Sequence, residues 1–142
     1  MKRTEERAPR LGEVYMVEFT GTGSEQLGRR PAVVFQNNVG NHYSPNVIVL
    51  PLTSSLKKLN LPTHIFLPSS VGLPRDSVVL CENPVTVSKS RVGTYVTTVP
   101  DDHLREIANG FVLATSATAF LDYKDFLSTQ QKGMRMNSGV PA

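Results

Sequence analysis

An acidic side chain and an arginine lie close together in one short, glycine-containing stretch of the sequence. The segment Gly23-Ser24-Glu25-Gln26-Leu27-Gly28-Arg29-Arg30-Pro31 ends where an apolar run begins. Arg30 directly precedes a proline, which disfavours helical backbone and favours an extended one. A guanidinium there could bind two phosphate oxygens at once. The residues alone leave an alternative open, a simple salt bridge between Arg30 and Glu25 at a strand edge.

Three consecutive hydroxyl side chains follow a second apolar run. Leu52 ends this run, and Thr53, Ser54 and Ser55 come directly after it. Hydroxyl groups and open backbone N–H groups at a strand end can donate hydrogen bonds to a phosphate oxygen. The alternative is that these side chains only satisfy the backbone of the turn that ends the strand, as Ser and Thr often do.

No motif indicates metal or cofactor chemistry. The sequence has no GxxxxGK[ST] phosphate loop, no HExxH and no CxxC, and His42, His64 and His103 are widely separated. The single cysteine, Cys81, excludes an intramolecular disulfide, and its apolar neighbours predict a buried thiol rather than a nucleophile. We therefore expect any catalysis to need no cofactor and no metal.

The net charge of +3 and the pI near 9.2 invite a nucleic-acid partner, but the position of the charge weakens that argument. Residues 1–10 carry four basic and two acidic side chains, and residues 123–142 carry three basic and one acidic, so each end has a net charge of +2. The middle, 11–122, then has eight basic and nine acidic side chains, a net charge of −1. The sequence has no apolar run near the roughly 20 residues of a membrane span and no signal peptide, which predicts a cytoplasmic protein.

Short apolar runs separated by turn residues indicate a β-rich domain. Glu13–Phe19 alternates between two faces, and Pro31–Gln36 and Asn46–Leu52 have the apolar character of buried strands. Further strands are predicted at Thr63–Leu67, Ser77–Cys81, Val85–Ser88 and Arg91–Val99. Residues 37–45 and 55–60 are expected to be turn-rich connections. Many short strands of this kind predict a small barrel.

The hydrophobic period changes after Pro100. Apolar residues recur every three or four positions from Leu104 to Leu121, which predicts a helix of about five or six turns. Asp101 and Asp102 suit its start, because carboxylates cap free N–H groups and meet the positive end of the helix dipole. We expect one folded domain at 11–122, between a disordered basic arm at 1–10 and a flexible tail at 123–142.

Five segments in order resemble the MazF/PemK family of toxins: GEVYMVEF, GSEQLGRRPAVVFQN, YSPNVIVLPLTSS, KLNLPTHIFL and RDSVVLCE. The resemblance runs from residue 11 to about residue 121. It implies a small SH3-like β-barrel of the MazF/PemK/CcdB type with a C-terminal helix, assembled as a homodimer. It also implies that Arg30 and Thr53 form the catalytic pair, and that Glu25 is the family's loop carboxylate.

The resemblance extends to an RNA-binding surface, with departures from the family pattern. Where many members have E-Q-[IP]-R-T, this chain has Glu82-Asn83-Pro84-Val85-Thr86, which puts the recognised RNA sequence in doubt. The candidate RNA-binding residues are Ser24, Arg29, Gln36, Asn37, Ser54, Lys57, Lys58, Glu82 and Asn83. Gln36 and Asn37 could equally build the turn that follows, and the two lysines could simply be solvated.

The resemblance implies the toxin component of a type II toxin-antitoxin system. Such a toxin would cleave single-stranded mRNA at specific sequences without metal, and would inhibit translation and growth. The 2′-OH would attack the neighbouring phosphate and leave 2′,3′-cyclic phosphate and 5′-OH ends. A cognate MazE-like antitoxin would bind through an acidic disordered segment. The alternative is a CcdB-like, non-nucleolytic gyrase poison of the same fold, against which the absence of tryptophan counts.

Overall fold

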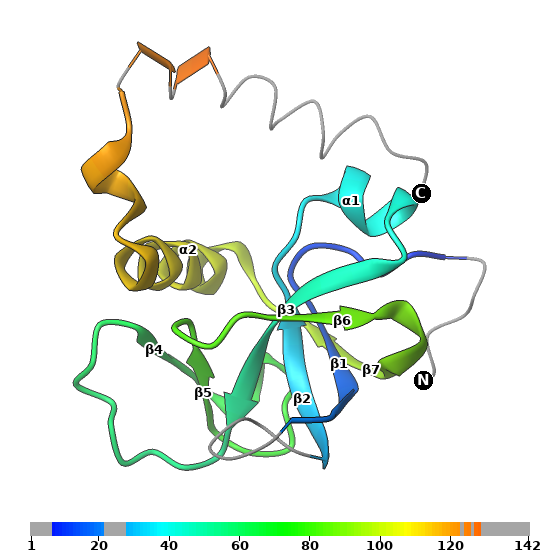
Figure 1. Ribbon diagram of the computed structural model, residues 1–142. Helices are drawn as coiled ribbons and strands as arrows, with labels where there is room; N and C mark the ends of the chain where they lie inside the picture. The colour runs from blue at the N-terminus through cyan, green and yellow to red at the C-terminus, as the bar shows by residue number, and fades with distance from the viewer. Residues whose placement is uncertain (1–6, 22–27, 123, 126, 129–142) are drawn as a thin grey trace.

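The computed structural model describes residues 7–21, 28–122, 124–125 and 127–128. Seven antiparallel strands form one sheet in the order β4-β5-β3-β2-β1-β7, and β6 pairs with β3 beside this path. The long helix α2 (Asp101–Thr115) packs on one side of the strands (Figure 1). The strands are β1 (Glu13–Phe19), β2 (Gly28–Val34), β3 (Asn46–Thr53), β4 (His64–Leu67), β5 (Ser77–Leu80), β6 (Val85–Ser88) and β7 (Val92–Thr98).

The alternation expected in Glu13–Phe19 is confirmed and separates two cores. Val14 faces a cluster that also contains Leu50, Leu52 and Ile107 of α2. Tyr15, Val17 and Phe19 face a second cluster with Ala32 and the valines of β3. Successive side chains of a strand point to opposite faces, so one strand serves both cores. The same alternation fixes which face each functional side chain of β2 and β3 occupies.

Strand β3 joins two parts of the sheet. Its residues 46–49 pair with β6, residues 49–51 pair with β2, and Leu52 and Thr53 pair with β5. The strands β6-β3-β2-β1-β7 curve around the second core, as the expected SH3-like barrel does. Among the described residues no pairing joins β6 to β7, so the sheet is barrel-like without being closed.

A short helix, α1 (Asn38–Tyr43), replaces the turn-rich connection expected at residues 37–45. The side chain of Asn37 caps it by accepting from Gly40 N at 2.9 Å. Gln36 donates to Asn41 Oδ1 and to Asn46 O, and accepts from Ile48 N. Side-chain amides thus add to the backbone hydrogen bonds of this connection, a contribution that hydrophobic periodicity does not reveal.

The helix α2 (Asp101–Thr115) is shorter than the five or six turns expected. Ser116 adopts φ 55, a left-handed conformation that ends the helix, and a 3-10 turn, η3 (Ala117–Phe120), follows. Asp101 and Asp102 lie in the first turn, but Pro100 is the N-cap and no side chain caps the helix. The dipole argument for the two aspartates holds, and the capping argument is wrong.

Residues 7–10, the end of the arm expected to be disordered, pack on the folded domain, whereas residues 1–6 of that arm and most of the expected tail lie outside the described residues. Pro9 is buried, and Arg7 pairs with the buried Glu13 at 2.8 Å. The hydrogen bond to this carboxylate raises the pKa of Arg7. No helix in the described part of the chain is long and apolar enough to span a membrane.

Candidate active site

Arg30 and Thr53 lie at the same level on neighbouring strands and on the same face of the sheet. Ala32 pairs with Pro51. One step of two residues along each antiparallel strand from that pair leads to Arg30 on β2 and Thr53 on β3. Residues opposite each other in such a ladder share a face. The register therefore aligns the two residues expected to form the catalytic pair on one face, just beyond the last paired residues of β2 and β3.

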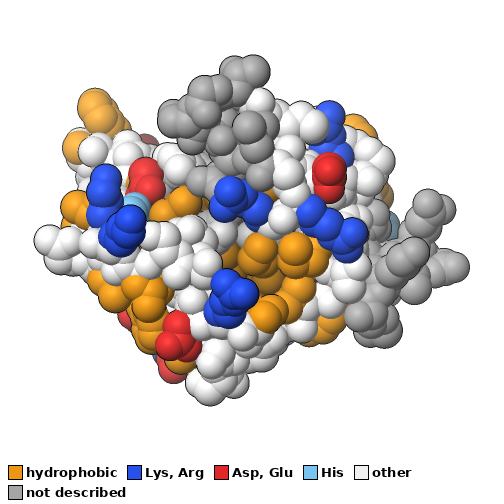
Figure 2. All heavy atoms as spheres, turned by 90° about the horizontal axis from the view of Figure 1, so that it is seen from below, with side chains coloured by type: hydrophobic (Ala, Val, Ile, Leu, Met, Phe, Trp, Pro, Cys, Tyr) orange, Lys and Arg blue, Asp and Glu red, His pale blue; other side chains and the backbone are white. Residues whose placement is uncertain are grey.

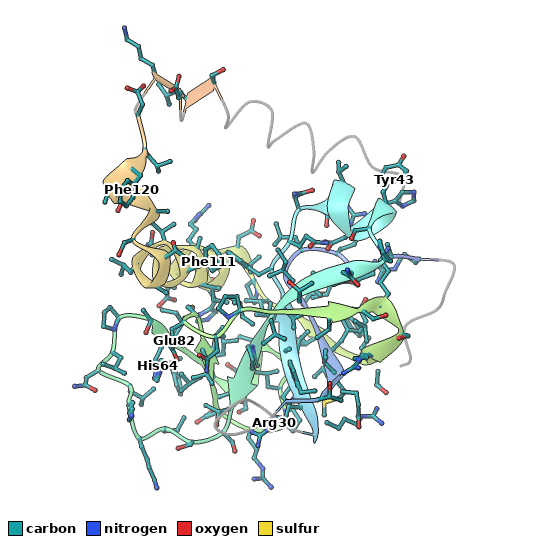
Figure 3. All side chains as sticks on the ribbon, viewed as in Figure 1. Arg30, Tyr43, His64, Glu82, Phe111 and Phe120 are labelled. Carbon is teal, nitrogen blue, oxygen red and sulfur yellow. The ribbon has the colours of Figure 1, made fainter. Side chains whose placement is uncertain are left out.

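The strands part where these two side chains lie. Beyond Pro51, β3 turns to pair with β5, so Thr53 is opposite Val78. Arg30 is exposed and Thr53 half-buried, and Figure 3 shows the arginine pointing out at the lower edge of the sheet. A phosphate can approach between a guanidinium and a hydroxyl arranged in this way, and both can donate hydrogen bonds to it.

The hydroxyl of Thr53 has a structural role as well. Its Oγ1 accepts a hydrogen bond from Ser55 N at 3.1 Å, which is the turn-capping alternative considered above. A threonine hydroxyl also carries one hydrogen to donate. The capping bond thus fixes the oxygen in place and leaves its hydrogen for an anion, so the two interpretations are compatible.

Arg29 lies on the opposite face from Arg30, because neighbouring residues of a strand alternate. Its Nη2 donates to Thr94 Oγ1 on β7 at 2.9 Å, and its strand partner is Glu18. It lines a hollow of about 360 Å³ together with Glu18 and Arg91. The structure does not bring Arg29 together with the candidate catalytic pair.

A larger hollow, of about 870 Å³, is lined by Phe19, Thr20, Arg91 and the segment from Glu82 to Ser88. It contains Glu82 and Asn83, which the sequence suggested for RNA binding. Figure 2 views the molecule from below, the side on which Figure 3 places Arg30. There, Lys and Arg side chains flank an apolar area. Basic groups around an apolar surface suit a nucleic-acid strand, whose phosphates and bases need both.

The other candidates are distributed unevenly. Ser54, Lys57 and Lys58 are exposed on the connection that leaves Thr53. Gln36 and Asn37 lie beyond the far end of β2, about 20 Å along the strand from Arg30 at ~3.3 Å per residue. Their amides are engaged in the α1 connection described above. Ser24 and Glu25 lie outside the described residues.

Sequence reasoning missed one contact in this region. His64 Nε2 lies 2.8 Å from Glu82 Oε1, and His64 Nδ1 lies 3.0 Å from the carbonyl oxygen of Lys58. The sequence predicted only that His64 lies in a strand. Glu82 is 18 positions away in the chain, so only the pairing of β4 with β5 brings the two side chains together.

The thiol of Cys81 is unsuited to nucleophilic chemistry. The side chain is fully buried, as the sequence predicted, with Ile107 O at 3.6 Å from its sulfur. Desolvation, with a smaller contribution from the charge of Glu82, raises its pKa to about 12. A thiolate, the reactive form, is therefore not formed near neutral pH. Among the described residues, no group of three or more His, Cys, Asp or Glu side chains is placed to hold a metal ion.

A protein-family model of the PemK-like, MazF-like toxin of type II toxin-antitoxin systems matches residues 10–114. The chain belongs to this toxin family. A curated member of this MazF-like family, Endoribonuclease MazF of Staphylococcus saprophyticus, is 36% identical over 117 residues, which cover 81% of this chain and 98% of the relative.

Solved structures of MazF proteins have the same fold. MazF (Form-I) of Deinococcus radiodurans superposes with a TM-score of 0.69 at 28% identity, covering 78% of this chain and 98% of that one. In MazE–MazF (Form-II) of Deinococcus radiodurans, the matching chain gives a TM-score of 0.64 at 27% identity, covering 81% and 99%. The MazF-like domain expected from the sequence is therefore confirmed in both family and fold.

Proposed function

We propose that this toxin is a metal-independent endoribonuclease that cleaves single-stranded RNA, with Arg30 and Thr53 as its catalytic pair. The observation that carries the proposal is the strand register, which places the R-P arginine and the strand-ending threonine on one face where β2 and β3 part. Family membership and the relative named Endoribonuclease MazF support the same activity.

In the proposed reaction, the 2′-OH of RNA attacks the adjacent phosphorus. The P–O5′ bond breaks, and the products are a 2′,3′-cyclic phosphate and a 5′-OH. Arg30 neutralises the charge that develops on the non-bridging oxygens, and the Thr53 hydroxyl donates to the same phosphate. Donors fixed in advance at the place where charge develops are often the largest contribution to catalysis. We assign proton acceptance from the 2′-OH to Glu25, on the basis of the resemblance alone.

The substrate contacts follow from this placement. RNA leaving the catalytic pair meets Ser54, Lys57 and Lys58 on one side and the hollow with Glu82 and Asn83 on the other. We also propose that the protein acts in the cytoplasm. It would act there as a homodimer, controlled by an acidic antitoxin. The MazE–MazF structures of Deinococcus radiodurans support such a partner. No specific observation favours the gyrase-poison alternative.

The decisive experiment is to map the ends of RNA incubated with purified protein in excess EDTA. We expect cleavage at defined sequences with 5′-OH and 2′,3′-cyclic phosphate ends, and the Arg30→Ala variant serves as the inactive control. If EDTA abolishes cleavage and a divalent ion restores it, the metal-free mechanism is wrong. If RNA stays intact with and without metal, the proposed function is wrong.

A further inference from the structure

The connection that carries Lys57 and Lys58 has little apolar anchoring of its own. Every residue from 54 to 62 is exposed, including Leu56, Leu59 and Leu61. Its backbone bonds are local: Ser55 N donates to Thr53 Oγ1, Leu61 N donates to Lys58 O at 3.4 Å, and Leu61 O accepts from His64 N at 3.0 Å. A segment with few buried contacts samples many conformations, which disperses the charges it carries.

His64 links this segment to a distant part of the chain. At the start of β4, its Nδ1 contacts Lys58 O at 3.0 Å while its Nε2 contacts Glu82 Oε1 at 2.8 Å. The imidazole is mostly covered, with 12% of its side chain exposed, against 36% for Glu82. Figure 3 shows His64 and Glu82 close together, at the ends of β4 and β5.

The two contacts of His64 link the segment 54–62 to the 870 Å³ hollow, and both would contact RNA in the proposed reaction. Lys58 O belongs to the segment that leaves Thr53, and Glu82 lines the 870 Å³ hollow. Glu82 follows the buried Cys81, whose backbone N donates to Thr63 O at 3.0 Å. The backbone next to Glu82 is therefore held in place by the pairing of these two segments. A neutral imidazole has one N–H and donates to only one of these acceptors at a time, whereas a ring with a hydrogen on both nitrogens donates to both and links Lys58 to the hollow.

We propose that His64 is a positioning residue for RNA, because it braces the basic segment 54–62 against Glu82 and holds Lys57 and Lys58 beside the path of the phosphates. This inference rests on the proposed ribonuclease function. Without the brace, the two ammonium groups spread over more positions, and binding weakens, whereas the reacting groups of Arg30 and Thr53 stay in place. The effect belongs to substrate binding, in KM, and not to the chemical step.

The test compares kcat and KM for a short single-stranded RNA at several salt concentrations. His64→Ala should raise KM about tenfold and change kcat by no more than about twofold, since binding is lost equally from substrate and transition state. The dependence of log KM on log salt should become shallower, by up to ~0.7 for each phosphate that the lysines no longer neutralise. His64→Gln, whose amide can donate to Glu82, should recover part of the loss.

A mutant cycle shows whether His64 acts through the lysines. In a Lys57→Ala/Lys58→Ala background, His64→Ala should add less than about a twofold change in KM, because coupled residues are not additive. His103→Ala is the matched control: His103 pairs with Glu106 on α2 at 3.2 Å, away from β4, and its loss should change neither KM nor the salt dependence.

Hydrogen exchange of residues 54–62 in the RNA-free protein separates this inference from the proposed function. We expect faster exchange there in His64→Ala than in the wild type. Unchanged exchange, a fall in kcat at constant KM, or a full effect in the lysine-free background would each overturn the positioning role. A wild-type protein that binds and cleaves no RNA would instead overturn the proposed function, and the exchange data would still show whether the brace exists.

Discussion

At the scale of single residues, strand alternation decides which of two adjacent arginines can take part in the reaction. Arg30 shares its face with Thr53, whereas Arg29 donates to Thr94 on the other face. Arg30→Ala and Thr53→Ala should each lower kcat/KM by about a hundredfold or more, the size of losing one fixed donor. Arg29→Ala should lower it by no more than about threefold, because its side chain points away from the pair.

The measurement is cleavage of a fluorescent RNA under single-turnover conditions, with far-UV circular dichroism to confirm that each variant folds. Equal losses for Arg29→Ala and Arg30→Ala would contradict the assignment of faces. This distinction was not available before the register was known, since the sequence made Arg29 a candidate RNA-binding residue beside Arg30.

The buried thiol of Cys81 provides a second test at this scale. Burial raises its pKa to about 12 from an ordinary 9.0, so the thiol stays neutral in the folded protein. The native protein should therefore be almost unreactive to DTNB at pH 8, and should react fully in guanidinium chloride. A raised folded-state pKa favours the folded state below pH 9, and this contribution is lost as the pH rises toward 12. Rapid labelling of the native protein would contradict the burial.

At the scale of elements, the sequence predicted strands far better than their connections. The positions of β1, β3 and β6 follow from runs of apolar and β-branched residues; the bounds of β1 and β6 agree, and β3 ends one residue later than expected. The helix α1 and the early end of α2 depend instead on the Asn37 cap and on the left-handed Ser116, which hydrophobic periodicity does not reveal. The bridge between His64 and Glu82 was equally hidden, because the register of β4 with β5 creates it.

Helix α2 packs closely on Ile65 and Cys81 at Gly110. A Cβ at Gly110 would lie 2.9 Å from Cys81 Sγ and 3.2 Å from Ile65 Cγ1. Gly110→Ala gains about 1 kcal/mol of helix propensity but forces the two elements apart, an overpacking that costs about 1–3 kcal/mol. We expect a net loss in the free energy of unfolding, measured by urea denaturation.

Asn109→Ala, one position earlier on the exposed side of α2, is the matched control. It gains propensity without a clash and should be neutral or slightly stabilising. Combining Gly110→Ala with Cys81→Ala should recover part of the loss, because the sulfur that the new methyl group meets is gone. A Gly110→Ala protein more stable than the wild type would show that the helix is not closely packed there.

At the scale of the whole molecule, large apolar side chains gather beyond the core at the end of α2. Phe120 is 89% exposed, Leu113 56% and Leu121 50%, and Figure 3 places Phe120 away from the sheet. Exposed apolar groups in proximity are typical of interaction surfaces. We expect a homodimer in sedimentation equilibrium, which Phe120→Asp weakens. Tyr43→Asp, at a residue 74% exposed on α1, should leave the mass unchanged. A wild-type monomer would exclude the dimer.

The charge of the molecule also predicts how an inhibitory partner would act. Residues 11–122 have a net charge of only −1, so Lys57 and Lys58, which are both exposed, are positive groups on a surface of otherwise balanced charge. An acidic antitoxin segment that contacts them would compete with RNA, raising KM without changing kcat. Its affinity should fall with rising salt, because exposed charges are screened, and should fall again in Lys57→Ala/Lys58→Ala.

Thr53→Ala should leave this affinity unchanged, since one hydroxyl contributes little to a long wrapped segment. The partner encoded beside the gene, titrated into the cleavage assay and into sedimentation runs, tests each step, and a partner that binds without inhibiting would contradict competition.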